Sequence, residues 1–172
     1  MDYFIMQQDP KINNIVTLKN WQKAIYDDSP VYKIAQIPIK TRNVYVEDRM
    51  YNEYPDFLSE PIPLIAKELM QVITLYQKDI RMNPVVLIEK KIRLQTVYYS
   101  LDVPEIHCAS VNSELDHIGR IKELVIDTNA VGGKRIFRVI GYKDRIIVRL
   151  DVAESILRRG AYGIIFEKLV TD

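Results

Sequence analysis

The chain contains few of the residues on which metal sites and disulfides are built. Its 172 residues include one cysteine, Cys108, and two histidines, His107 and His117. A single cysteine excludes an intrachain disulfide and favours a reducing compartment. Zinc sites need about three or four nitrogen or sulfur ligands at suitable spacing, which these side chains do not have. We therefore expect no metal and no other cofactor.

Six glycines are also too few, and wrongly placed, for a phosphate-binding loop. Gly132-Gly133-Lys134 lacks the first glycine and the Ser or Thr of a P-loop. Gly160 and Gly163 follow a predicted helix instead of preceding one, so their N–H groups are not arranged around a phosphate. We interpret the first group as a surface turn and the second as the end of a helix.

Long apolar runs and a strong charge of either sign are absent as well. No stretch approaches the ~20 apolar residues that span a bilayer, and residues 1–10 lack the basic region of a signal peptide. The net charge is +1, which shows no bias toward polyanions. These absences predict a cytoplasmic protein with no membrane partner and no nucleic-acid partner.

The composition is that of a globular α+β domain. About half of the residues are hydrophobic and about a quarter are charged, which is the usual balance. The length suits one domain over 1–172, with a less regular N-terminal part at about 1–60. Apolar and alternating segments predict a largely antiparallel sheet, with strands at 3–6, 44–46, 85–88, 92–99, 106–111 and 124–126 and a hairpin formed by 135–140 and 145–150. Residues 31–40, which contain two prolines, suit an edge strand or an irregular extended segment.

Two helices are predicted. The longer spans about 61–79, because Pro61 suits a first turn and apolar residues then recur at spacings of three and four: Ile65, Leu69, Val72, Ile73 and Tyr76. The shorter spans about 152–159, with Asp151 as N-cap, Glu154 completing a capping box, and Gly160 in the left-handed conformation at its end. A buried final strand is expected at 164–166.

A small hydrolase is one function to consider. Cys108 or Ser100 would be the nucleophile, and either would need His107 or His117 within hydrogen-bond reach. Neighbouring residues on a strand point to opposite faces, so His107 cannot serve Cys108 locally. No G-x-S-x-G elbow surrounds a serine. Because free cysteine packs as a small hydrophobe, a core position is the simpler prediction for Cys108.

The C-terminal third resembles a family of bacterial immunity proteins that are encoded beside polymorphic toxins and were earlier catalogued as a domain of unknown function. The matching segments are 136–141, 146–148, 151–159 and 163–166. The similarity is best over 98–169, within a C-terminal part at about 85–172. Some members carry the label "serine protease", but this sequence contains no triad that would explain it. We assign a role in holding the fold to the matching residues Phe137, Arg138, Gly141, Asp151, Glu154, Arg158, Arg159, Gly160, Gly163 and Phe166.

The resemblance implies binding without catalysis. An immunity protein occupies a cognate toxin domain and neutralises it by steric and electrostatic occlusion. Such inhibitors use a complementary surface of about 1,600 Å² in total, often with aromatic anchors. The chain has one segment that mixes aromatic and acidic side chains, and we predict the contact surface there, at Glu47, Asp48, Tyr51, Glu53, Tyr54, Asp56 and Phe57. Its carboxylates would suit a basic cleft, such as that of a nuclease; an ordinary loop with half-buried aromatics is the alternative interpretation.

Overall fold

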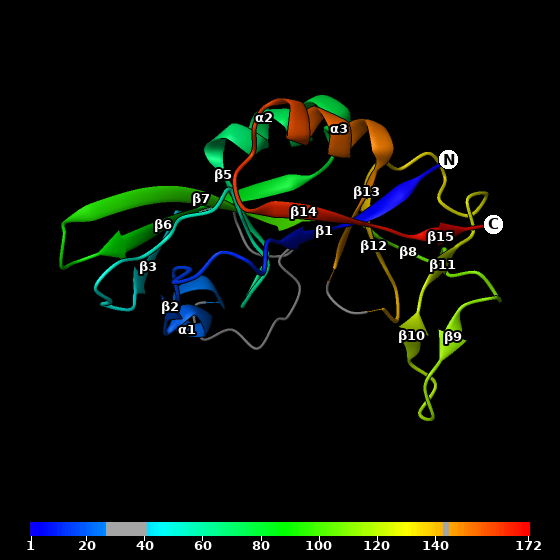
Figure 1. Cartoon of the computed structure of the whole chain (residues 1–172), viewed down its shortest axis with the longest axis horizontal. Helices are drawn as coiled ribbons and strands as arrows, with labels where there is room; N and C mark the ends of the chain where they lie inside the picture. Colours follow the sequence, from blue (N-terminus) through cyan, green and yellow to red (C-terminus); the bar gives the residue numbers. More distant parts are fainter. Residues whose placement is uncertain (27–40, 143–144) are drawn as a thin grey trace.

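A computed structural model of the chain describes residues 1–26, 41–142 and 145–172. The edge strand or extended segment expected over 31–40 and residues 143–144 of the expected hairpin loop lie outside the described residues. The architecture is α+β with largely antiparallel sheets, as the sequence predicts. The described residues form a five-stranded sheet, a six-stranded sheet, two two-stranded sheets and three helices (Figure 1).

The five-stranded sheet combines the first strand of the chain with strands from its C-terminal part. Its order is β14 (Ile164–Lys168), β1 (Tyr3–Gln8), β13 (Ile146–Arg149), β12 (Ile136–Val139) and β8 (Glu105–Ile106). The predicted hairpin is confirmed, because β12 and β13 pair antiparallel with Ile136 opposite Val148. The final strand is not buried as predicted. Because β14 is an edge strand, Ile164 is buried but Ile165 is exposed and Phe166 half-buried.

The six-stranded sheet is built around a long hairpin that projects from the body of the molecule (left in Figure 1). Its order is β2 (Leu18–Lys19), β3 (Arg42–Val46), β6 (Arg81–Glu89), β7 (Leu94–Asp102), β5 (Leu64–Ala66) and β4 (Phe57–Leu58). β3 runs parallel to β6, and the other neighbouring pairs are antiparallel. The two smaller sheets pair β9 (Glu114–Leu115) with β10 (Ile121–Glu123), and β11 (Val125–Ile126) with β15 (Val170–Thr171).

The three helices are α1 (Trp21–Tyr26), α2 (Lys67–Tyr76) and α3 (Leu150–Arg158). The single long helix expected over 61–79 is wrong in its first part, because residues 64–66 form β5 and pair with both β7 and β4. A fully buried strand and a buried helix give the same short apolar run. The apolar face of the remaining part is confirmed, since Leu69, Val72 and Ile73 are buried.

Helix α3 ends as predicted but begins differently. Gly160 has a positive φ of 68° and its N–H donates to the carbonyl of Leu157 at 2.9 Å. The N-cap is Arg149, which has an extended backbone and forms no capping hydrogen bond through its side chain. Asp151 therefore is not the cap: its carboxylate accepts from the Arg149 guanidinium, with Nε 2.8 Å from Oδ1. Glu154 pairs with Arg158 one turn on, at 3.1 Å, and forms no capping box.

The Asp151–Arg149 pair makes the stability of the fold depend on pH. The hydrogen bonds from Arg149 hold the pKa of Asp151 below its usual value. The pair therefore stabilises the fold fully at pH values above the ordinary aspartate pKa of about 3.9, and this stabilisation is lost as the pH falls through the lower pKa of the folded state. We expect Asp151→Asn to reduce the free energy of unfolding at neutral pH by no more than about 1 kcal/mol, since solvent screens the pair. The difference from the wild type should vanish in acid.

Urea denaturation of both proteins at neutral and at acid pH measures this difference. Glu154→Gln is the matched control, because it removes an acid from the same helix but only an exposed pair of about 0.5 kcal/mol or less. A difference between Asp151→Asn and the wild type that persists in acid would contradict the role given to the pair.

A shared hydrophobic core joins the two larger sheets. Met6 and Ile136 enter it from the five-stranded sheet, and Phe57 and Ile65 enter it from the six-stranded sheet. Helices α2 and α3 lie side by side above these strands (Figure 1) and close the core with Leu69, Val72, Ile73, Val152 and Ile156. Within the described residues, no helix is both long enough and apolar enough to cross a membrane.

Candidate functional site

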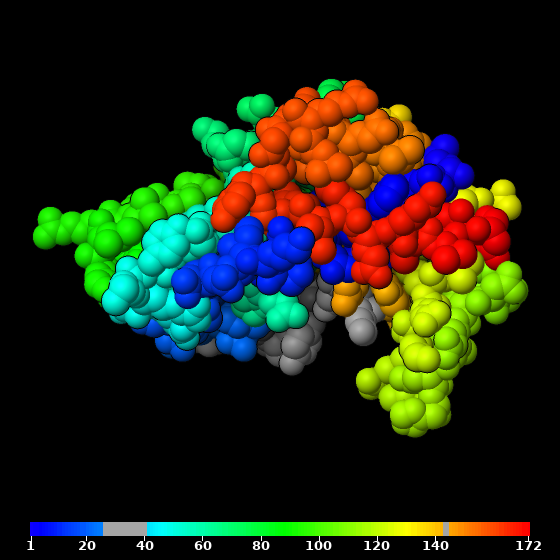
Figure 2. All heavy atoms as spheres, viewed as in Figure 1, coloured from blue at the N-terminus to red at the C-terminus, as the bar shows by residue number. Residues whose placement is uncertain are grey.

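The predicted contact segment, residues 47–57, is a loop that lies against another loop near the N-terminus. Ile15 and Glu53 form an isolated parallel bridge, with the Glu53 N–H donating to the Asn14 carbonyl at 2.9 Å and the Val16 N–H donating to the Glu53 carbonyl at 3.0 Å. Figure 2 shows this segment (cyan) beside residues 9–17 (blue) and the turn at 160–163 (orange-red). Backbone hydrogen bonds therefore hold the loop in one place on the surface.

Two of the predicted acidic residues are already paired with basic ones. Glu47 contacts the Arg49 guanidinium and Asp48 contacts the Lys19 ammonium, both at 3.2 Å. The Arg49 guanidinium also donates to the Ile15 carbonyl and to the Thr17 hydroxyl, which ties the start of the segment to its neighbour. Glu47 and Asp48 consequently add little net negative charge to this surface.

The other two acids meet two exposed tyrosines in a group that we call the tyrosine–acid cluster: Tyr51, Glu53, Asp56 and Tyr162. The Glu53 carboxylate accepts hydrogen bonds from both phenols, from Tyr51 and, at 3.2 Å, from Tyr162. The Asp56 carboxylate accepts from the Tyr162 N–H at 2.7 Å. The tyrosine side chains remain 56% and 47% exposed respectively, so the cluster presents two fixed aromatic rings and two carboxylates at the surface.

The pKa values of both phenols reflect this arrangement. The hydrogen bond to Glu53 raises the pKa of Tyr51, and partial desolvation followed by the Glu53 charge raises the pKa of Tyr162. Both phenols therefore stay protonated at neutral pH and keep donating their hydrogen bonds to Glu53. Tyr162 was not predicted from the sequence, because it lies more than a hundred positions from Glu53 and no local pattern links the two.

Two of the predicted aromatic anchors are not available to a partner. Phe57, in β4, is only 1% exposed and belongs to the shared core. Tyr54 is half-buried, and its hydroxyl donates to Glu89 at 2.6 Å. Burial and this carboxylate together raise the pKa of Tyr54. Phe57 and Tyr54 hold the segment to the sheet, so fewer of the seven predicted side chains are exposed than the sequence suggests.

The turn after α3 positions the cluster. Gly163 has a φ of +75°, and a Cβ at this position would lie 2.4 Å from Cβ of Pro55 and 2.8 Å from Cδ1 of Ile12. Its carbonyl accepts from the Asp9 N–H at 2.9 Å, and the backbone of Asp56 donates to the Tyr162 carbonyl at the same distance. Only glycine allows the three loops to meet here.

The remaining motif residues also have contacts within the fold. Phe137 is buried and packs edge-on against the Tyr3 ring, with centroids 5.5 Å apart. Gly141 adopts a φ of +81° at the turn after β12. Arg159 donates to the Ser155 carbonyl at 2.9 Å, near the end of α3. Arg138 is half-buried in β12, where its strand pairs with β8.

The structure does not bring the candidate nucleophiles to a cleft with a histidine. Cys108 is 1% exposed and packs in an apolar cluster with Tyr3, Phe137 and other side chains. Ser100 is 3% exposed, and its hydroxyl donates to the Asn83 carbonyl. His107 and His117 are both exposed. These positions give Cys108 and Ser100 structural roles.

Burial also controls the reactivity of Cys108. Desolvation raises the pKa of its thiol to about 11, which leaves little thiolate near neutrality. We expect native protein at about pH 8 to react with a thiol-specific disulfide reagent more than about a hundredfold slower than free cysteine. Absorbance of the released thiol measures the rate, and the denatured chain is the control that should react at once. Rapid labelling of the native protein would contradict the buried position.

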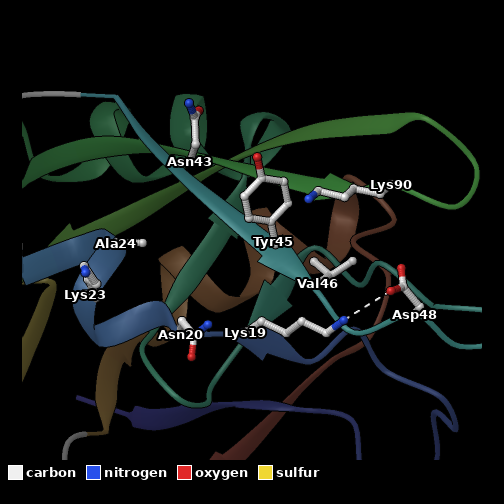
Figure 3. A pocket seen from close by; sticks show the side chains of 9 residues that line it. All are labelled: Lys19, Asn20, Lys23, Ala24, Asn43, Tyr45, Val46, Asp48 and Lys90. Carbon is white, nitrogen blue, oxygen red and sulfur yellow. Dashed lines mark hydrogen bonds and ion pairs between the residues drawn. The ribbon is translucent and has the colours of Figure 1, made fainter.

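A pocket, which we call the lysine pocket, opens beside the start of the predicted segment. It is a cavity of about 390 Å³, and Figure 3 shows its side chains rising from β2, α1, β3 and the β6–β7 turn. Its lining residues are Lys19, Asn20, Lys23, Ala24, Asn43, Tyr45, Val46, Asp48 and Lys90. The sequence did not predict this pocket, apart from Asp48, because its residues come from three separate segments, 19–24, 43–48 and Lys90, without a shared motif.

Metal binding has no structural basis in the part of the chain that is described. Among residues 1–26, 41–142 and 145–172, no group of three or more His, Cys, Asp or Glu side chains could hold a metal ion. No family model and no curated protein matches the sequence.

Proposed function

We propose that the protein is an immunity protein that binds a cognate toxin domain and blocks it, with the tyrosine–acid cluster at the centre of the contact. The observation that carries the proposal is the Glu53 carboxylate, which two exposed tyrosines from distant parts of the chain hold in place. The resemblance of residues 98–169 to immunity proteins is the reason for choosing a toxin domain as the partner.

The physical argument rests on preorganisation. Tyrosine gives a large contact area and loses little rotamer freedom, which is why it is frequent at binding hot spots. Here the rings of Tyr51 and Tyr162 are already fixed by Glu53 before any partner arrives, so less conformational entropy remains to be lost on binding. The Glu53 and Asp56 carboxylates accept hydrogen bonds from Tyr51 and Tyr162, and their charge complements a basic cleft.

The buried positions of Cys108 and Ser100 favour this proposal over a hydrolase that uses either side chain. A nucleophile has to reach its substrate and its base, whereas an occluding protein needs only an exposed, rigid surface. We infer that the protein acts by contact and not through these two side chains.

The gene neighbourhood provides the first test. The adjacent open reading frame should encode a long secreted protein with a variable C-terminal domain, and co-expression of this protein with that domain should restore growth. Absence of rescue together with absence of a detectable complex would overturn the proposal.

Variants of the cluster test the surface itself. Against that toxin domain, Tyr51→Ala and Tyr162→Ala should each weaken binding by roughly 30-fold, which corresponds to a hot-spot loss of about 2 kcal/mol. Glu154→Gln removes an exposed acid elsewhere and serves as the control that keeps wild-type affinity. Calorimetry measures the dissociation constants. If both tyrosine variants bound the toxin domain with wild-type affinity, the contact surface would have to lie on another face of the protein.

A further inference from the structure

The lysine pocket carries positive charge at the end of the six-stranded sheet. Three lysines, Lys19, Lys23 and Lys90, line the pocket together with a single acid, Asp48. Lys19 is paired with Asp48 at 3.2 Å, but the two side chains are 42% and 53% exposed, and an exposed pair of this kind contributes at most about 1 kcal/mol. An incoming anion can therefore compete with Asp48 for Lys19.

Tyr45 and Lys90 form the rigid side of the pocket. The Lys90 ammonium lies over the Tyr45 ring, 4.2 Å from its centroid (Figure 3). Tyr45 itself lies in β3, in register with Ile88 on one side and Lys19 on the other, so the sheet holds the ring in place. This contact keeps one ammonium at the pocket in advance of binding and leaves the ring 45% exposed.

Neutral groups complete the lining. The amides of Asn20 and Asn43 offer donors and acceptors, while Ala24 and Val46 supply apolar surface. A cavity of 390 Å³ falls in the size range of small-molecule sites, which combine a mainly apolar wall with a few polar groups. The pocket thus has separate places for a charged group and for an organic group.

We propose that the lysine pocket binds a small phosphate ester, with the phosphate between the lysine ammonium groups and the organic part against Tyr45. Lysine binds phosphate as a compact point charge, and several lysines around one cavity can share the charge of one phosphate group. The lysines surround one cavity and do not form a track, which fits a single phosphate group better than a nucleic-acid strand. This site is independent of the proposed toxin contact.

The single tryptophan of the chain provides a reporter of binding. Trp21 is the first residue of α1 and lies between Asn20 and Lys23, two residues that line the pocket. We expect adenosine monophosphate to change its fluorescence in a saturable manner in the full chain, with weaker binding as salt is raised. Inorganic phosphate should bind at the same place more weakly, because it lacks the part that contacts Tyr45.

Substitutions in the pocket give the decisive comparison. Lys23→Gln and Lys90→Gln should each weaken binding of adenosine monophosphate by about tenfold, the usual effect of one charge-assisted hydrogen bond. Lys78→Gln is the matched control, because it removes the same charge from an exposed position after α2 and should leave binding unchanged. Circular dichroism of each variant verifies that it is folded.

Several results would overturn the proposal. The first is that adenosine monophosphate shows no saturable binding to the wild type at millimolar concentration. The second is that Lys78→Gln loses as much binding as the pocket variants, and the third is that both pocket variants bind as tightly as the wild type. A single-stranded oligonucleotide that binds far more tightly than the monophosphate would also overturn it, in favour of a nucleic-acid site. Because Lys23→Gln leaves the tyrosine–acid cluster unchanged, its effect on toxin binding separates this proposal from the proposed function.

Discussion

Replacing Gly163 with alanine is expected to destabilise the protein by about 3 kcal/mol. The new Cβ would lie 2.4 Å from Cβ of Pro55 and 2.8 Å from Cδ1 of Ile12, and the φ of +75° is unfavourable for any residue with a Cβ. Overpacking of this kind costs about 1–3 kcal/mol, and the left-handed backbone adds about 1–2 kcal/mol. Thermal denaturation should show a melting temperature lower by roughly 10 °C.

Gly160→Ala is the control for the backbone contribution alone. Gly160 has a similar φ of +68°, but a Cβ there would have no heavy atom within 4 Å among those described. We expect a loss of about 1 kcal/mol. If the two variants were equally stable, the contact of Gly163 with Pro55 would not be the cause, and the positioning of the tyrosine–acid cluster by this turn would need another explanation.

Phe57→Ala is expected to cost about 3–5 kcal/mol, the usual range for removing a large buried aromatic side chain. Phe57 is 1% exposed and packs against the core that joins both sheets and both α2 and α3. Because the two sheets share this core, loss of the ring should weaken the whole molecule and not only the loop that precedes it. Urea denaturation measures the change in the free energy of unfolding.

Tyr51→Ala is the matched control, since it removes an exposed aromatic side chain from the same segment. Its stability should stay within about 0.5 kcal/mol of the wild type, while its binding to the toxin domain falls. If Phe57→Ala were instead stable and bound the toxin domain more weakly, Phe57 would belong to the contact surface, as predicted from the sequence.

The elements that were predicted well have local signals. The hairpin of β12 and β13 has two short apolar segments on either side of a turn that contains Gly141. The end of α3 is marked by Gly160, whose positive φ suits glycine. The apolar spacing of Leu69, Val72 and Ile73 identified the buried face of α2. In each case a few neighbouring residues determine the backbone conformation.

The errors occur where a distant segment decides the outcome. Residues 64–66 continue the apolar pattern of α2 but form β5, because β4 and β7 offer hydrogen-bond partners on both sides. Asp151 has the sequence position of an N-cap but binds Arg149. Phe57 has neighbours that suit a surface loop, yet its ring faces the core. Local patterns do not contain these contacts.

The sequence by itself determined the α+β class, much of the strand content, the end of α3 and the segment in which the acidic and aromatic residues gather. Only the tertiary structure decided which of those residues are exposed, since it buries Phe57, pairs Glu47 and Asp48 with basic side chains, and brings Tyr162 to Glu53. It also assembles the lysine pocket from three segments. The reason is that hydrogen bonding and burial within an element depend on neighbouring residues, whereas a surface or a pocket depends on which elements pack together.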